Sequence, residues 1–109
     1  MDFNDYQREA RKTAVYPNVG SNLWYPALGL SSESGEVAGR VKKLYRDDNG
    51  KIDSTFRIRF EKELGDMLWY VAILASEAGI PLEDIANANL LKLRDRKDRG
   101  VLHGDGDER

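Results

Sequence analysis

The sequence contains no cysteine, only one histidine and no apolar run long enough to cross a membrane. Without cysteine the chain can form neither a disulfide nor a zinc–thiolate site, and it has no cysteine nucleophile. The single histidine, His103, lies in a tail rich in glycine and aspartate. Its isolation argues against histidine-based metal sites and against a Ser-His-Asp triad. No signal-peptide pattern opens the chain, so we expect a cytoplasmic protein with no membrane partner.

An excess of positive charge is also missing. The chain has 17 basic and 19 acidic residues, which gives a formal net charge of −2. Proteins that bind nucleic acid usually have a basic face, so we expect no nucleic-acid partner. Hydrophobic residues make up 40% of the sequence and charged residues 33%, as in a globular protein with much exposed helix. A length of 109 residues fits one domain, residues 1–109.

Apolar side chains recur at spacings of three and four residues, which is the pattern of helices with one buried face. We predict four helices, over residues 3–15, 24–47, 54–78 and 81–99. Asp2 or Asn4 is expected to cap the first helix and Ser54 the third, with Gly79 ending the third. No segment alternates polar and apolar residues over a useful length, so we expect no strands. The predicted fold class is therefore all-α, a bundle of four helices.

The third predicted helix has an almost continuous apolar stretch from Met67 to Ala75. A helix of this kind is expected to be covered on nearly every side. Because a single chain of this length buries only a modest fraction of its surface, we expect a homodimer or a dimer of dimers.

Two pairs of acidic residues stand at helical spacing, Glu33 with Glu36 and Glu63 with Asp66. Residues three positions apart share one face of a helix, so four carboxylates on two antiparallel helices can converge. Oxygen ligands suit Mg²⁺ or Mn²⁺. Like charges also raise each other's pKa, and a bound cation would relieve that repulsion. Such pairs occur in solvated surface helices too, so the pairs alone leave a structural role open.

Glycines interrupt the same two helices at Gly29, Gly35, Gly39 and Gly65. Each costs about 1 kcal/mol relative to alanine inside a helix. Their number predicts that the backbone approaches another helix or a ligand closely.

The order and spacing of several motifs resemble the MazG-like nucleoside triphosphate pyrophosphohydrolases, an all-α family. The resemblance covers essentially the whole chain. Its main motifs are Glu33-Ser34-Gly35-Glu36-Val37, Lys42-Lys43, Glu63-Leu64-Gly65-Asp66 with Leu68-Trp69-Tyr70, and Asn89, Lys92, Leu93, Arg96, Lys97, Arg99 and Gly100.

This resemblance implies hydrolysis of a nucleoside triphosphate to the monophosphate and pyrophosphate, with two or more Mg²⁺ or Mn²⁺ ions at each site. Glu33, Glu36, Glu63 and Asp66 match the metal-binding acids of the family. Glu36 and Glu63 are the expected catalytic residues, with Glu36 accepting the proton of the attacking water.

The resemblance also suggests substrate contacts. Lys92 and Arg96 share a helical face and would clamp the β- and γ-phosphates, with Asn89 on the same side. Lys43 and Lys97 are further candidates, although basic residues near a helix C-terminus also stabilise the helix itself. Trp24 and Tyr25 are candidates to stack on the base, whereas Trp69 is expected in the core.

The base is less constrained. The aromatic residues and an acidic tail, residues 100–109, favour GTP or dGTP, with Asp105 or Asp107 facing a guanine edge or a cation and the tail folding over a site in a neighbouring subunit. A pyrimidine substrate such as dCTP or dUTP, or broad house-cleaning activity, stays open.

Two other classes compete. A ferritin-like di-iron protein would need Glu-x-x-His motifs, and His103 lies outside the predicted helices. A non-catalytic helical interaction module is also compatible with the sequence.

Overall fold

The computed structural model describes all 109 residues, which form four helices and no strand. The helices are α1 (Phe3–Arg11), α2 (Trp24–Asp48), α3 (Ser54–Glu77) and α4 (Leu82–Asp98). The prediction of an all-α fold is confirmed. None of the helices is long and apolar enough to cross a membrane.

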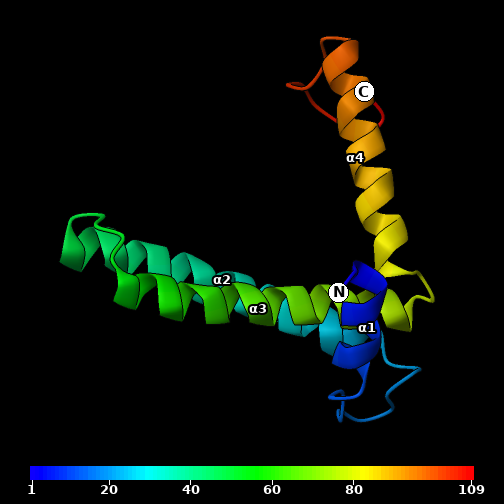
Figure 1. The fold of residues 1–109 in the computed structure, drawn as a ribbon, viewed down its shortest axis with the longest axis horizontal. Helices are drawn as coiled ribbons and strands as arrows, with labels where there is room; N and C mark the ends of the chain where they lie inside the picture. The colour runs from blue at the N-terminus through cyan, green and yellow to red at the C-terminus, as the bar shows by residue number, and fades with distance from the viewer.

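The helices form two arms rather than one closed bundle (Figure 1). Helices α2 and α3 lie side by side as a long antiparallel pair, and α1 packs across α3 near its C-terminal end. Helix α4 extends away from this pair, contacts only α1 and the end of α3, and has no contact with α2.

The ends of the helices follow local capping chemistry. Asp2 caps α1, with Asp5 completing a reciprocal capping box. Asp53, not Ser54, caps α3: its carboxylate accepts a hydrogen bond of 2.8 Å from the backbone N–H of Phe56. Pro81 precedes α4 as its N-cap and is not its first residue, because its extended ψ of 133° lies outside the helical range.

Helix α1 ends at Arg11 and does not reach residue 15 as predicted. The hydroxyl of Thr13 donates a hydrogen bond of 2.7 Å to the carbonyl of Ala10, an interaction that closes the last turn. The loop that follows is tied to α3 by Glu77. This carboxylate accepts hydrogen bonds from the Tyr16 hydroxyl and from the backbone N–H groups of Gly20 and Asn22.

The core is small and lies where α1, its loop, α3 and the start of α4 meet. Its buried residues are Ala10, Tyr16, Ala72, Ile73 and Leu82, and Trp69 packs against them as expected. Within one chain, the apolar stretch of α3 is not covered on every side as the sequence predicted: Leu68 remains 39% exposed. Leu68 borders a groove that it shares with Phe3 and Tyr6 of α1 and Glu83 of α4, and these side chains cover it only in part.

Close helix packing at a glycine is found at one of the four positions. A Cβ atom at Gly29 would lie 2.1 Å from the ring of Tyr70, so α2 and α3 approach each other there. At Gly35, Gly39 and Gly65 a Cβ atom would meet nothing within 4 Å. No other helix therefore approaches these three glycines closely within the chain, and close approach of a ligand to them stays a prediction.

Candidate metal centre

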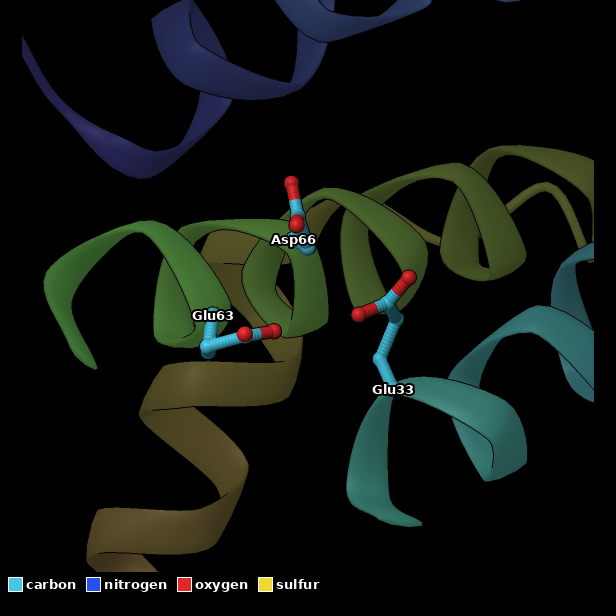
Figure 2. A group of neighbouring side chains, drawn as sticks. All are labelled: Glu33, Glu63 and Asp66. Carbon is cyan, nitrogen blue, oxygen red and sulfur yellow. The ribbon is translucent and has the colours of Figure 1, made fainter. Parts of the chain in front are cut away.

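Three carboxylates from α2 and α3 lie close together. Glu33 comes from α2, and Glu63 and Asp66 come from α3; one oxygen atom of each lies within 4.8 Å of the others. Figure 2 shows Glu33 and Glu63 reaching toward the same space between the two helices. The antiparallel pairing of the helices brings these acids together from positions about 30 residues apart in the sequence.

The three carboxylates repel one another because they carry like charges at short range. Glu33 and Glu63 are half-buried, and Asp66 is exposed. Burial raises the pKa of Glu33, and the negative charges of Asp66, Glu63 and Glu36 raise it further. Positive charge placed among the three would remove this penalty.

Glu36, the fourth predicted ligand, lies outside the group of converging carboxylates. Its side chain is exposed on α2, although its charge still reaches Glu33. The spacing of three residues predicted that Glu36 shares one face of α2 with Glu33. It could not show which of the two acids in the pair faces α3.

The donor set fits a hard divalent cation. All three groups are carboxylates, the ligands that Mg²⁺ and Mn²⁺ prefer, and no nitrogen or sulfur ligand lies among them. Glu63 also has a protein partner: Arg40 Nη2 donates to its Oε1 at 3.1 Å. The sequence reading missed Arg40, although its position seven residues after Glu33 puts both on one face of α2.

A polar cavity adjoins this cluster. Its volume is about 380 Å³, and it lies between α2 and α3 toward their connecting turn. Arg40 lines it together with Lys43, one of the predicted substrate contacts, and with Arg59 and Phe56 of α3.

The predicted phosphate clamp lies elsewhere in the chain. Lys92 and Arg96 share a face of α4 as expected, and both bind Asp107 Oδ1, at 2.9 and 3.0 Å. Because α4 does not contact α2, the chain does not bring this clamp to its own acidic cluster. Asn89 and Lys97 are exposed on α4 and make no side-chain hydrogen bond.

The tail folds back onto its own α4. In addition to the contacts of Asp107, the Arg109 guanidinium donates hydrogen bonds to the carbonyls of Val101, Leu102 and Gly106. Asp107, predicted to face a base or a cation, is thus engaged by two side chains of its own helix, and its pKa is lowered by hydrogen bonds from Lys92 and then Arg96.

The aromatic candidates differ in their freedom to bind a base. Trp24 is 80% exposed. Tyr25 stacks on Tyr16 with ring centroids 4.6 Å apart and an interplanar angle of 9°. Tyr70 is a further aromatic residue close to Tyr25 and Glu33. Its pKa is raised, mainly by burial and to a smaller extent by Tyr25 and by the charge of Glu33.

Comparison with known proteins identifies the family. Residues 26–101 match the model of the MazG nucleotide pyrophosphohydrolase domain, a stretch that includes all the converging acids. The chain is also 44% identical, over 114 aligned residues and the full length of both proteins, to the Gene 37 protein of Mycobacterium phage L5. No solved structure matches it. The chain therefore belongs to the MazG nucleotide pyrophosphohydrolase family.

Proposed function

We propose that this protein hydrolyses a nucleoside or deoxynucleoside triphosphate to the monophosphate and pyrophosphate, by attack of water at the α-phosphate. The observation that carries the proposal is the convergence of Glu33, Glu63 and Asp66 within 4.8 Å in a chain of this family. A nucleotide substrate would place the reaction in the cytoplasm, where triphosphates are available.

In this proposal Glu33, Glu63 and Asp66 hold divalent cations, Mg²⁺ or Mn²⁺, with two or more at each site. Such cations supply positive charge that stabilises the phosphoryl groups as the anhydride bond breaks. Glu36 is the proposed proton acceptor: it is exposed and not among the converging acids, so its carboxylate is available to take a proton from water.

The outer phosphates would be bound by Lys92 and Arg96, with Asn89 and Lys97 beside them and Lys43 nearer the acids. Because α4 and α2 of one chain do not touch, this clamp would reach the acidic cluster from a second copy. The proposal thus includes a homodimer or homotetramer.

For the base we propose stacking on Trp24 or Tyr25, with GTP or dGTP preferred. Asp107 is bound by Lys92 and Arg96, so Asp105 is the tail residue left to face a guanine edge. The alternative substrates are a pyrimidine deoxynucleotide or a broad range of altered nucleotides, and the product assay described next distinguishes them from GTP and dGTP.

The test is a product assay over canonical and modified nucleoside triphosphates with Mg²⁺ or Mn²⁺. We expect equal amounts of monophosphate and pyrophosphate. Glu63→Gln should lower kcat by at least about a hundredfold, since a lost metal ligand removes several kcal/mol of charge stabilisation. Glu61→Gln is the matched control, because Glu61 is an exposed residue of α3 two positions before Glu63 and forms no ion pair.

Circular dichroism should show the same helicity in both variants. Absence of turnover with every nucleotide would overturn the proposal and favour a non-catalytic interaction module. Release of inorganic phosphate instead of pyrophosphate would overturn the assigned bond.

A further inference from the structure

Arg40 is the one basic side chain in contact with the converging acids. Its Nη2 lies 3.1 Å from Glu63 Oε1, and both side chains are largely withdrawn from solvent, with exposures of 31% and 15%. Arg40 therefore neutralises part of the negative charge that Glu33, Glu63 and Asp66 bring together.

The contact is incomplete for an arginine. Guanidinium groups bind carboxylates most strongly through two parallel hydrogen bonds, whereas Arg40 makes one hydrogen bond to Glu63. Its Nε atom is buried and has no hydrogen-bond partner in the protein. A buried donor without a partner is unfavourable, so this arrangement is one that a better acceptor would replace.

The cavity lined by Arg40 offers a place for such an acceptor. The same side chain lines the cavity of about 380 Å³ between α2 and α3, where Lys43 and Arg59 add two further cations. Neither of those cations forms an ion pair within the chain. Two of the three aspartates that line the cavity are already engaged, Asp47 by Arg46 and Asp53 by the N-terminus of α3. Arg40 thus stands between an acidic cluster and a cavity with available positive charge.

On the basis of the proposed function, we propose that Arg40 exchanges partners during substrate binding. Without a divalent cation its guanidinium pairs with Glu63. When a cation takes Glu63, the guanidinium turns to a phosphate group of the substrate in the cavity beside Lys43 and Arg59. Arg40 then contributes a substrate contact that exists only in the metal-loaded site.

The exchange has a thermodynamic consequence that does not depend on turnover. Arg40 competes with the cation for Glu63 and is released to bind phosphate, so phosphate and cation favour each other's binding. By linkage, each raises the affinity of the other by the same factor.

The experiment measures Mn²⁺ binding by calorimetric titration, with and without pyrophosphate, and expresses it against the free Mn²⁺ that remains after the solution complex of Mn²⁺ with pyrophosphate is subtracted. Arg40→Gln should bind Mn²⁺ more tightly than the wild type when pyrophosphate is absent, because the competing cation is gone. It should also lose most of the coupling between pyrophosphate and Mn²⁺, which we expect to be on the order of tenfold in the wild type. Arg40→Lys retains the charge and should stay close to the wild type.

Arg57→Gln is the matched control, because Arg57 is exposed on α3, forms no ion pair and does not line the cavity. A merely structural role for Arg40 would give weaker Mn²⁺ binding in Arg40→Gln, and that result would overturn the exchange. Unchanged coupling in Arg40→Gln would overturn it as well. A wild-type protein that binds no Mn²⁺ would overturn the proposed metal site itself, and the exchange with it.

Discussion

Glu33 is the residue at which folding and metal binding conflict most directly. Burial and three neighbouring acids raise its pKa above the ordinary value of 4.5. A raised carboxyl pKa means that the ionised form is disfavoured in the folded state. The penalty is absent well below pH 4.5, grows as the pH rises from 4.5 toward the raised folded value, and levels off above that value.

Replacing Glu33 by glutamine should therefore stabilise the metal-free protein at neutral pH. We expect a higher Tm for Glu33→Gln than for the wild type in a chelator, measured by thermal unfolding, and a much smaller increase in Tm when Mn²⁺ is added. The difference in the chelator should shrink below pH 4.5, where Glu33 is protonated in both states. Glu61→Gln should behave like the wild type. A Glu33→Gln protein that is less stable in the chelator would contradict this account.

Among the individual residues, the sequence predicted which acids converge better than it predicted the side chains that surround them. The spacing of Glu63 and Asp66 put both on one face of α3, and the structure brings Glu33 to them. The exclusion of Glu36 and the contact of Arg40 could not be predicted, because they depend on the register between α2 and α3. That register is a long-range property, set by contacts such as the one between Gly29 and Tyr70.

At the scale of the elements, the α2–α3 pair depends on that contact. We predict that Gly29→Ala destabilises the protein by roughly 1–3 kcal/mol, since the added Cβ would overlap the ring of Tyr70. Gly39→Ala, on the same helix with nothing within 4 Å, should stabilise it by up to about 1 kcal/mol through helix propensity. Urea denaturation measures both. Equal effects of the two substitutions would show that the close approach at Gly29 does not hold the helices together.

The tail and α4 form a second unit, joined by Asp107. Lys92 and Arg96 lower the pKa of this carboxyl below its ordinary value of 3.8. The ionised Asp107 therefore stabilises the folded state above pH 3.8, and this stabilisation is lost as the pH falls through the lowered pKa of the folded protein. The structure places this contact within one chain, whereas the sequence pattern could not distinguish it from a contact to a neighbour.

Asp107→Asn should release the tail and leave α4 intact. We expect faster amide hydrogen exchange over residues 101–109 at neutral pH, because Arg96, only 5% exposed, loses its charged partner. Asp105→Asn is the control, since Asp105 makes no side-chain hydrogen bond or ion pair. Slow exchange of the tail in Asp107→Asn would mean that the hydrogen bonds of Arg109 suffice to hold it.

Helix types and most boundaries followed from periodicity and capping residues, and the misses were local. The first helix stops early because Thr13 and the contacts of Glu77 with the next loop offer alternative hydrogen bonds. The direction of α4 was not predictable from periodicity. An apolar stripe shows that a helix face is to be covered, but it does not show whether the cover comes from the same chain.

At the scale of the whole molecule, one chain is more open than a compact domain of its length. Its radius of gyration is 16.7 Å, against about 13 Å for a compact domain of this length. Its accessible surface is 7970 Å², against roughly 6,100 Å² for a compact protein of its mass. The excess is of the size that obligate homodimers bury.

The exposed apolar surface indicates where a second copy would bind. An all-apolar groove of about 190 Å³ lies at the elbow between α3 and α4, lined by residues that include Leu30, Leu74 and Ile85. Ile85, on α4, is 37% exposed there. A copy seated in this groove would cover the apolar side chains that α2, α3 and α4 present there.

We therefore predict that the wild-type protein is a dimer or tetramer in light scattering and that Ile85→Glu dissociates it, because a carboxylate in an apolar interface loses its hydration without gaining a partner. Asn87→Glu, two residues further on exposed α4 surface, should leave the assembly intact. The proposed clamp of Lys92 and Arg96 reaches the acids only from a second copy, so Ile85→Glu should also lose activity, and activity should fall on dilution of the wild type. A wild-type monomer that keeps full activity at every concentration would contradict both the assembly and the shared site.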